Sequence, residues 1–149
     1  MKQLTILMLA LFFIACEKDD NTNKISEQTE NNNNNEITIT TLSEDDYSGL
    51  SGESFNLIIQ TQQELDSIWT IIYANTLPST DSPEVDFDKE LVLLAYMGTF
   101  PTGGYSIKIT EVKLEDGVYN YNILTSSPDT NSVVTNAFTA PYHLVRFSR

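Results

Sequence analysis

The side chains that could carry out chemistry are few and scattered. The chain has 149 residues, with one histidine, His143, and one cysteine, Cys16. A Ser–His–acid arrangement would have to use His143, and no serine stands in a nucleophile-elbow pattern. Neither histidine nor cysteine clusters, so nothing favours a zinc site. We therefore expect no enzyme, no catalytic residue, no metal and no cofactor, and we expect His143 to be a half-exposed strand residue.

An acidic loop, DSPEVDFDKE, is a candidate for cation binding. Its carboxylates could supply oxygen ligands to Ca²⁺: Asp81, Glu84, Asp86 and Asp88. The spacing is not that of an EF-hand loop, and the central glycine is missing. A solvated loop that enters a buried strand, with Phe87 turned inward, is the interpretation we favour. The sequence leaves calcium binding at residues 81–88 open.

The segment GTFPTGGYSI is the main candidate for contact with another molecule. Pro101 and Thr102 suit a type I turn with Gly103 in the left-handed region beyond it, which is a three-residue hairpin loop. That turn does not require Gly104, which lets another backbone approach closely beside Tyr105. A plain turn and a contact surface both remain open.

These candidates must be positioned by a domain that we expect at residues 36–149. Alternating or continuous apolar runs predict its strands: 36–40, 54–60, 90–97, 105–114, 118–124 and 142–147. The run at 90–97 is nearly all apolar, which indicates a central strand covered on both faces. A change of phase near Thr110 and Glu111 indicates a bulge, and EDG indicates a hairpin turn.

One helix is predicted, beginning after Thr61. Thr61 and Glu64 form a capping box, and an apolar stripe follows at helical spacing: Leu65, Ile68, Trp69 and Ile72. Pro78 and Pro83 forbid continuation of the helix. The fold class we expect is α+β, an antiparallel sheet of five or six strands with one helix packed on a face.

The N-terminus predicts export. Residues 1–15 have a short positive region at Lys2, an apolar stretch and a small residue before Cys16, as in a secretory signal. The ending resembles the lipobox of bacterial lipoproteins, although Phe13 stands where that family usually has Leu. Acylation, for example by palmitate, would explain the single Cys16, since one cysteine cannot form an internal disulfide. A cleaved soluble signal that leaves a free cysteine is the other interpretation.

Residues 16–35 are expected to form a lipidated, disordered linker, because they are polar and carry no aromatic residue. Two or three acyl chains on Cys16 would anchor the protein in a membrane. The EKDD that follows resembles an export signal to the outer leaflet of the Gram-negative outer membrane, and plain linker charge is the alternative. We therefore expect an outer-membrane lipoprotein of the bacterial cell envelope, with surface exposure left open.

The net charge argues against nucleic acid as a partner. The formal charge is −13, and removal of residues 1–15 takes away Lys2 and no acid, which makes it −14. Such a chain is repelled by nucleic acid and by anionic lipid surfaces. A cationic partner or loosely held divalent ions fit this charge better.

Several stretches resemble the C-terminal domain of the PrcB family of protease-complex lipoproteins. The matching residues are Val85-Asp86-Phe87, Gly98, the PTGGY run and the Pro141-Tyr142 pair before the last strand. The resemblance implies a non-catalytic subunit that stabilises an envelope or surface protein such as a protease. The partner-binding residues we expect are Pro101, Thr102, Gly103, Gly104, Tyr105, Pro141 and Tyr142.

A fainter resemblance gives an alternative function. Chagasin-type inhibitors of cysteine proteases use an NPTTGY-like and an RPW-like loop side by side, and FPTGGYS and TAPYHL are similar to these in type and order. The inhibitor family's glycine-rich third loop has no counterpart here, and a helix is foreign to that fold. The alternative is a protease-inhibitor-like module that uses the PTGGY and APY loops.

Overall fold

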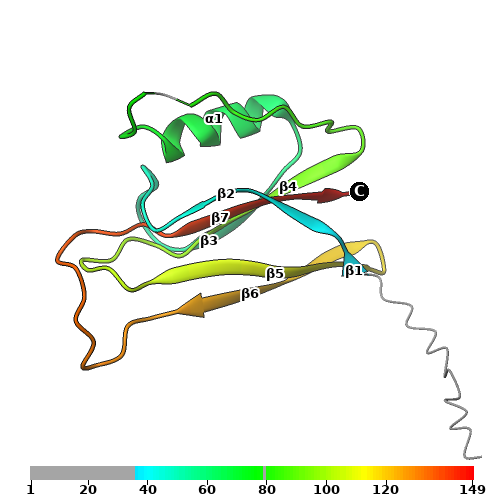
Figure 1. The fold of residues 1–149 in the computed structure, drawn as a ribbon. Coiled ribbons are helices and arrows are strands. Elements are labelled where there is room, and N and C mark those ends of the chain that lie inside the picture. The colour runs from blue at the N-terminus through cyan, green and yellow to red at the C-terminus, as the bar shows by residue number, and fades with distance from the viewer. Residues whose placement is uncertain (1–35, 79) are drawn as a thin grey trace, which may run out of the picture. The chain divides into compact units, whose positions relative to one another are not determined.

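The computed structural model describes residues 36–78 and 80–149. The predicted signal, Cys16 and the linker at 16–35 lie outside these residues. The described residues form three layers, in which one helix, a four-stranded sheet and a three-stranded sheet are stacked (Figure 1). All strand pairs are antiparallel.

The four-stranded sheet is the middle layer and has the order β2-β7-β4-β3. Its strands are β2 (Ile39–Asp45), β3 (Phe55–Ile59), β4 (Glu90–Tyr96) and β7 (Tyr142–Ser148). The two inner strands, β4 and β7, are buried along almost their whole length. The prediction that residues 90–97 form a strand covered on both faces is confirmed.

The three-stranded sheet has the order β1-β5-β6. It consists of β1 (Glu36–Ile37), β5 (Ser106–Glu115) and β6 (Val118–Ser126). The pairing of β5 with β6 shifts register between Ile109 and Glu111, which confirms the predicted bulge. At the predicted turn, Asp116 and Gly117 both have positive φ.

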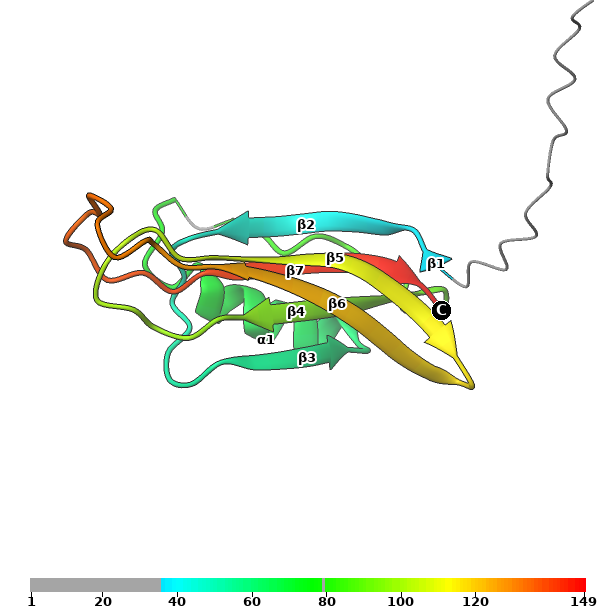
Figure 2. The same ribbon diagram turned by 90° about the horizontal axis from the view of Figure 1, so that it is seen from below.

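The prediction of one sheet with five or six strands is wrong, since the strands divide between two sheets. Residues 97–105 carry the chain from β4 in one sheet to β5 in the other, and Gly98 has a φ of 107° at the start of this crossing. In Figure 2, β5 and β6 pass across the face of the four-stranded sheet. The apolar pattern of each strand shows which face is buried, but it does not show which strands share a sheet.

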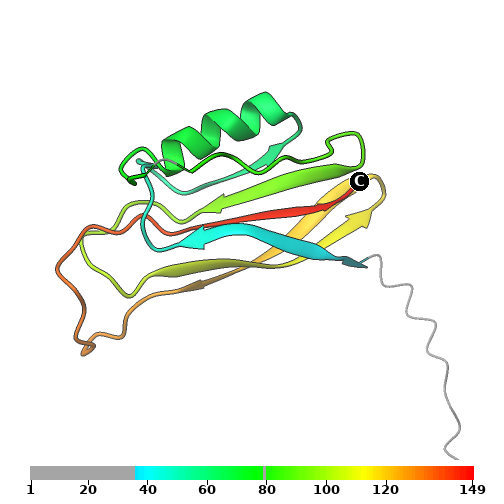
Figure 3. The ribbon, with the colours of Figure 1, turned by 45° about the horizontal axis from the view of Figure 1, so that its top comes forward.

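The helix α1 (Gln62–Ile72) covers the other face of the four-stranded sheet (Figure 3). The Thr61 side chain accepts a hydrogen bond from the Glu64 N–H at 3.2 Å, as the capping box predicts. The Glu64 carboxylate reaches one residue further back than expected and accepts from the Gln60 N–H. The predicted apolar stripe packs on the sheet, with Leu65, Trp69 and Ile72 buried.

Two hydrophobic clusters hold the layers together, and β4 contributes to both. Val92 and Leu94 face the cluster under α1. Leu91 and Leu93 face the cluster beneath the three-stranded sheet. Each fully buried aliphatic side chain of this kind contributes about 1.5–3 kcal/mol to folding, so the middle layer fixes the positions of both outer layers.

Candidate partner-binding site

Two loops at one end of the domain lie against each other, and we name them together the double loop. It consists of residues 98–105, between β4 and β5, and residues 127–140, between β6 and β7; both project from the same end in Figures 1 and 2. Phe100 and Thr139 exchange backbone hydrogen bonds of 2.8 and 2.9 Å, and the Gly103 N–H donates to the Thr135 carbonyl at 3.0 Å. The Thr139 hydroxyl donates to the Thr102 carbonyl at 2.8 Å. The PTGGY segment is therefore half of a paired structure. Of the two interpretations left open, the plain β-hairpin turn is wrong, because β4 and β5 belong to different sheets.

The two glycines of this segment are explained by packing within the domain. The predicted left-handed conformation at Gly103 is found instead at Gly104, whose φ is 92°. A Cβ atom at Gly103 would lie 2.3 Å from the Thr135 hydroxyl oxygen, and one at Gly104 would lie 3.0 Å from Cβ of Pro128. The close approach at Gly104 is made by side chains of the other half of the double loop, Pro128 and Val134, and not by another backbone as predicted.

Tyr105 braces the base of the double loop. Its ring stacks on Phe100 with a centroid separation of 3.9 Å and an interplanar angle of 9°. The side chain is half-buried. One face of the ring is therefore used within the domain.

The exposed apolar residues of the double loop lie mainly in its second half. Phe138 is 75% exposed and Val133 is fully exposed. In the first half, Pro101 is exposed and Thr102 is half-buried. The sequence analysis did not identify Phe138 and Val133, because neither lies in a predicted strand or in a motif that it used. A large aromatic residue in a polar segment was the available signal.

Pro141 and Tyr142 do not belong to this exposed surface, because both are buried at the start of β7. The Tyr142 hydroxyl is 2.6 Å from the Ser43 hydroxyl, which is also 2.8 Å from the Tyr73 hydroxyl. Burial raises the pKa of the Tyr142 phenol, which stays protonated. The fold brings Pro141 near the double loop through a 3.0 Å bond from the Met97 N–H to its carbonyl, but it leaves Pro141 and Tyr142 inaccessible to a partner.

His143 is only 1% exposed, so its prediction as a half-exposed residue is wrong. The Ile109 N–H donates to its Nδ1 at 2.9 Å. Its Nε2 lies 2.9 Å from the Thr41 hydroxyl oxygen and 3.3 Å from a Glu44 carboxylate oxygen. Burial lowers the pKa of His143, the nearby Glu44 opposes this shift, and Lys108 adds to it. Both ring nitrogens are engaged in contacts between strands.

The acidic loop at 81–88 packs and pairs locally. Phe87 and Val85 pack against the core under α1, which confirms that Phe87 turns inward. The Asp86 carboxylate accepts from Lys89 Nζ at 2.5 Å, which lowers the pKa of Asp86. Among residues 36–78 and 80–149, no group of three or more His, Cys, Asp or Glu side chains is placed to share a metal ion. Within the same residues, no helix has the length and apolar character needed to cross a membrane.

Residues 91–148 match the model of the family described as PrcB C-terminal. The matched segment runs from β4 to β7 and includes both halves of the double loop, and it confirms the resemblance seen in the sequence. Strands β1 to β3 and α1 lie outside the match. No curated protein and no solved structure matches the chain.

Proposed function

We propose, starting from the match of residues 91–148 to the PrcB C-terminal family, that this protein is a non-catalytic lipoprotein subunit. It binds and stabilises an envelope or surface protein such as a protease. Acyl chains on Cys16 anchor it to the outer membrane, and residues 16–35 form the tether. The contact surface is formed by the exposed apolar side chains of the double loop, Phe138 and Val133.

The observation that carries this proposal is the exposure of Phe138 and Val133 on a braced loop within the matched segment. An exposed aromatic residue offers a large contact area at a low cost in conformational entropy, and such residues dominate many interfaces. The hydrogen bonds of Phe100 and Gly103 to the other loop hold this surface in place before binding. A preorganised loop loses less entropy when a partner binds.

The test is an affinity pull-down of tagged, lipidated protein from detergent-solubilised envelope, read by mass spectrometry. Phe138→Lys places a charge at the proposed contact, and Val118→Lys is the matched control. Val118 is also exposed, but it lies at the β5–β6 turn, about 30 Å along β5 from the double loop. The proposal requires that the native protein and Val118→Lys capture the same protein while Phe138→Lys does not. Equal capture by a folded Phe138→Lys would exclude the double loop as the contact.

A protease-inhibitor-like module is the alternative, and the pairing of the two loops favours it. Residues 98–105 and 135–139 lie side by side, as two loops that enter a cleft would. Because Pro141 and Tyr142 are buried, the second loop would have to present Phe138 instead. Titration of cysteine proteases with the protein, read by hydrolysis of a peptide substrate, separates the two functions. Undiminished hydrolysis by every protease of the panel would exclude the inhibitor function.

A further inference from the structure

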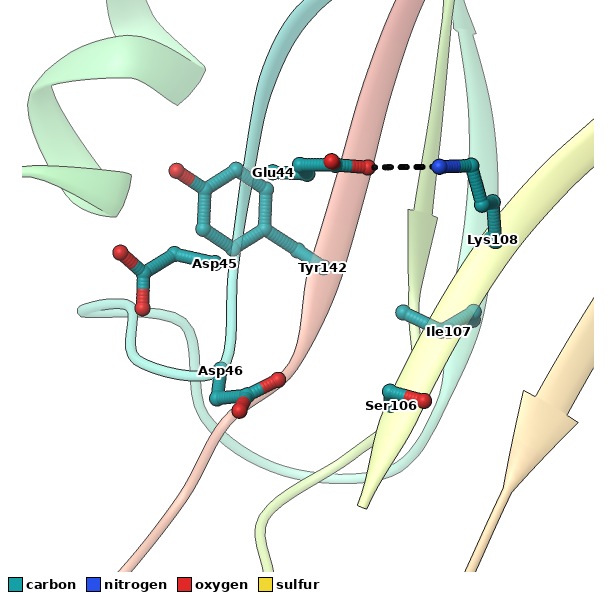
Figure 4. A pocket seen from close by; sticks show the side chains of 7 residues that line it. All are labelled: Glu44, Asp45, Asp46, Ser106, Ile107, Lys108 and Tyr142. Carbon is teal, nitrogen blue, oxygen red and sulfur yellow. Dashed lines mark ion pairs between the residues drawn. The ribbon is translucent and has the colours of Figure 1, made fainter. Parts of the chain in front are cut away.

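The outer strand of the three-stranded sheet, β6, has an unpaired edge in the described residues. β6 pairs with β5 alone (Figure 2). In residues 36–78 and 80–149, its backbone makes no main-chain hydrogen bond outside this pairing. The other side of β5 is engaged, because the Ile109 N–H bonds to His143. On that side Lys108 also reaches Glu44 at 3.5 Å (Figure 4). β6 is therefore the strand of this sheet that another strand can join.

Every second residue of β6 directs its backbone N–H and C=O groups away from β5. Ile123 is opposite Ile109, whose N–H turns away from β6 toward His143. Opposite residues of an antiparallel pair are either bonded to each other or both directed outward, so the groups of Ile123 also point outward. The two-residue turn before β6 gives the same alternation, because the residues that flank such a turn are bonded to each other. The outward residues are Tyr119, Tyr121, Ile123 and Thr125.

Two observations show that these outward groups are open within the described part of the chain. The one side-chain hydrogen bond to the β6 backbone in those residues runs from Thr110 of β5 to the Asn122 carbonyl, on the side that faces β5. A hollow of about 360 Å³ lies between the start of β3 and the end of β6, with Asn56 on one side and Ile123 and Thr125 on the other. The strand β3 therefore leaves this edge accessible.

β6 lacks the features that keep an edge strand from pairing with other strands. Its sequence, VYNYNILTS, has no charge and no proline, whereas natural edges are commonly blocked by lysine, proline or an inward charge. Its outer face exposes Val118 (60%) and Leu124 (64%). Asn120 and Asn122 lie between them and bond to acids of β5. An uncharged edge in a chain with a formal charge of −13 favours an uncharged strand as its neighbour.

A second copy of β6 can complete the missing hydrogen bonds. Two β6 strands related by a two-fold axis run antiparallel, and an interface of this kind must match itself. With the axis beside Tyr121, this residue is opposite its own copy, and Tyr119 of each chain is opposite Ile123 of the other. All three residues have outward backbone groups, so each opposite pair exchanges two hydrogen bonds.

The same register matches the exposed side chains. It places Val118 of each copy opposite Leu124 of the other, and Asn120 opposite Asn122. The apolar side chains then cover each other at both ends of the interface, and the amides meet between them. Cross-strand pairs of matched character stabilise a sheet. A shift of the axis by one residue along β6 separates Val118 from Leu124, so the side chains favour the register centred on Tyr121.

We propose that β6 pairs with β6 of a second copy of this chain, with Tyr121 on the two-fold axis. The two three-stranded sheets then form one continuous antiparallel sheet. Two nine-residue strands make a small interface, of the class under about 1,200 Å² that gives weak, reversible complexes. This surface is separate from the double loop and does not depend on the function proposed for Phe138.

Disulfide trapping in the full-length protein, in detergent solution, tests the register. In a Cys16→Ser background the introduced thiols are the only ones. A mixture of the Val118→Cys and Leu124→Cys variants should form a crosslinked dimer, because opposite residues place their Cα atoms about 4.5 Å apart. Each variant alone should not, because its two equivalent cysteines would lie about 20 Å apart along the strands, beyond the limit of about 7 Å for a disulfide.

Charge variants test the apolar contacts by sedimentation equilibrium. Leu124→Lys should weaken self-association about tenfold, because a charge replaces an apolar side chain at both ends of the interface. Adding Val118→Glu should restore it, since the new carboxylate lies opposite the new ammonium group of the other copy. Phe138→Lys should leave it unchanged. Higher salt should strengthen association of the native protein, because each copy carries a formal charge of −13.

Three results would overturn the proposal. The first is equal crosslinking by the mixture and by either single variant alone, which would show contact without this register. The second is absence of self-association and of crosslinked dimer, or self-association that a folded Leu124→Lys protein retains in full. The third is protection of the Tyr121 N–H from amide exchange at every protein concentration, because another segment of the same chain would then occupy the edge.

Discussion

The backbone N–H of Ile109 donates a 2.9 Å hydrogen bond to Nδ1 of His143, and these two residues belong to different sheets. A backbone N–H can only donate, so Nδ1 must be unprotonated and the neutral ring carries its proton on Nε2. From there the ring meets Thr41 and Glu44 on β2. One buried imidazole thus joins three strands, and it can do so only while it is neutral.

This geometry predicts that the protein loses stability in mild acid. Burial lowers the pKa of His143 below its ordinary value of 6.5, so below that pH the unfolded chain binds a proton that the folded domain does not. The stability gained from neutral His143 is complete above about pH 6.5 and declines as the pH falls below it. Urea unfolding followed from about pH 8 to about pH 5 measures the slope.

His143→Asn is the control for this effect. Its amide oxygen can still accept from the Ile109 N–H, but the side chain does not titrate. The variant should be less stable at neutral pH, because the contacts of Nε2 are lost, and its stability should change little between about pH 7 and pH 5.5. A parallel decline of both proteins over this interval would assign the acid sensitivity to other groups.

Of the two neighbouring loop glycines, Gly49 and Gly52, Gly49 should tolerate substitution less well. A Cβ atom at Gly49 would lie 2.1 Å from the backbone carbonyl oxygen of Ile71, near the end of α1. Its N–H also donates to the Ile72 carbonyl. We expect Gly49→Ala to cost about 3 kcal/mol or more, because backbone must move.

Gly52→Ala is the comparison for this substitution. Its φ is +96°, with no atom within 4 Å of an added Cβ, so only conformational strain opposes the change. The expected cost is about 1 kcal/mol. Chemical denaturation of both variants compares them, and similar losses of stability would contradict the steric account of Gly49.

Tyr142→Phe should affect stability and leave partner binding intact. The substitution removes the hydroxyl that contacts Ser43, while Ser43 keeps its contact with Tyr73. We expect a loss of about 1 kcal/mol in the free energy of unfolding and unchanged capture in the pull-down described above. Loss of capture by a folded Tyr142→Phe protein would restore this residue as a contact.

Thr139→Val should loosen the double loop without unfolding the domain. Thr139 is buried, and its hydroxyl donates to the Thr102 carbonyl. Loss of this bond should cost about 1 kcal/mol and should speed amide exchange at Gly103, whose N–H bonds to the opposite half of the loop. Thr110→Val, which removes a hydroxyl bond to Asn122 in β6, should leave exchange at Gly103 unchanged.

Local features of the fold could be predicted from the sequence because each depends on neighbouring residues. The cap at Thr61, the stripe that includes Trp69 and the bulge at Thr110 are all of this kind. The division into two sheets could not be predicted, because the alternating pattern of β5 is the same whether or not this strand also pairs with β4. The residues at the crossing from one sheet to the other, which begins at Gly98, are of the same types as those found in a hairpin turn.

The candidate site shows the same division. The PTGGY run indicated one half of the double loop, since glycines beside an aromatic residue indicate a backbone conformation or a close packing that other residues do not allow. The other half, with Phe138, became visible only when long-range hydrogen bonds placed residues 127–140 against it. The burial of Tyr142 and His143 depends on layers contributed by distant segments, and a single strand pattern does not contain that information.

The position of β7 has a consequence for the order of events in folding. It is the last strand in the chain, yet it lies between β2 and β4 and pairs with both. Until residues 142–148 are available, β2 has no neighbour and β4 has only β3. Residues 46–141 separate β2 from β7, and closure of so long a loop is slow. A chain that emerges N-terminus first, from a ribosome or through a pore, must therefore wait for residues 142–148 before the middle layer can form.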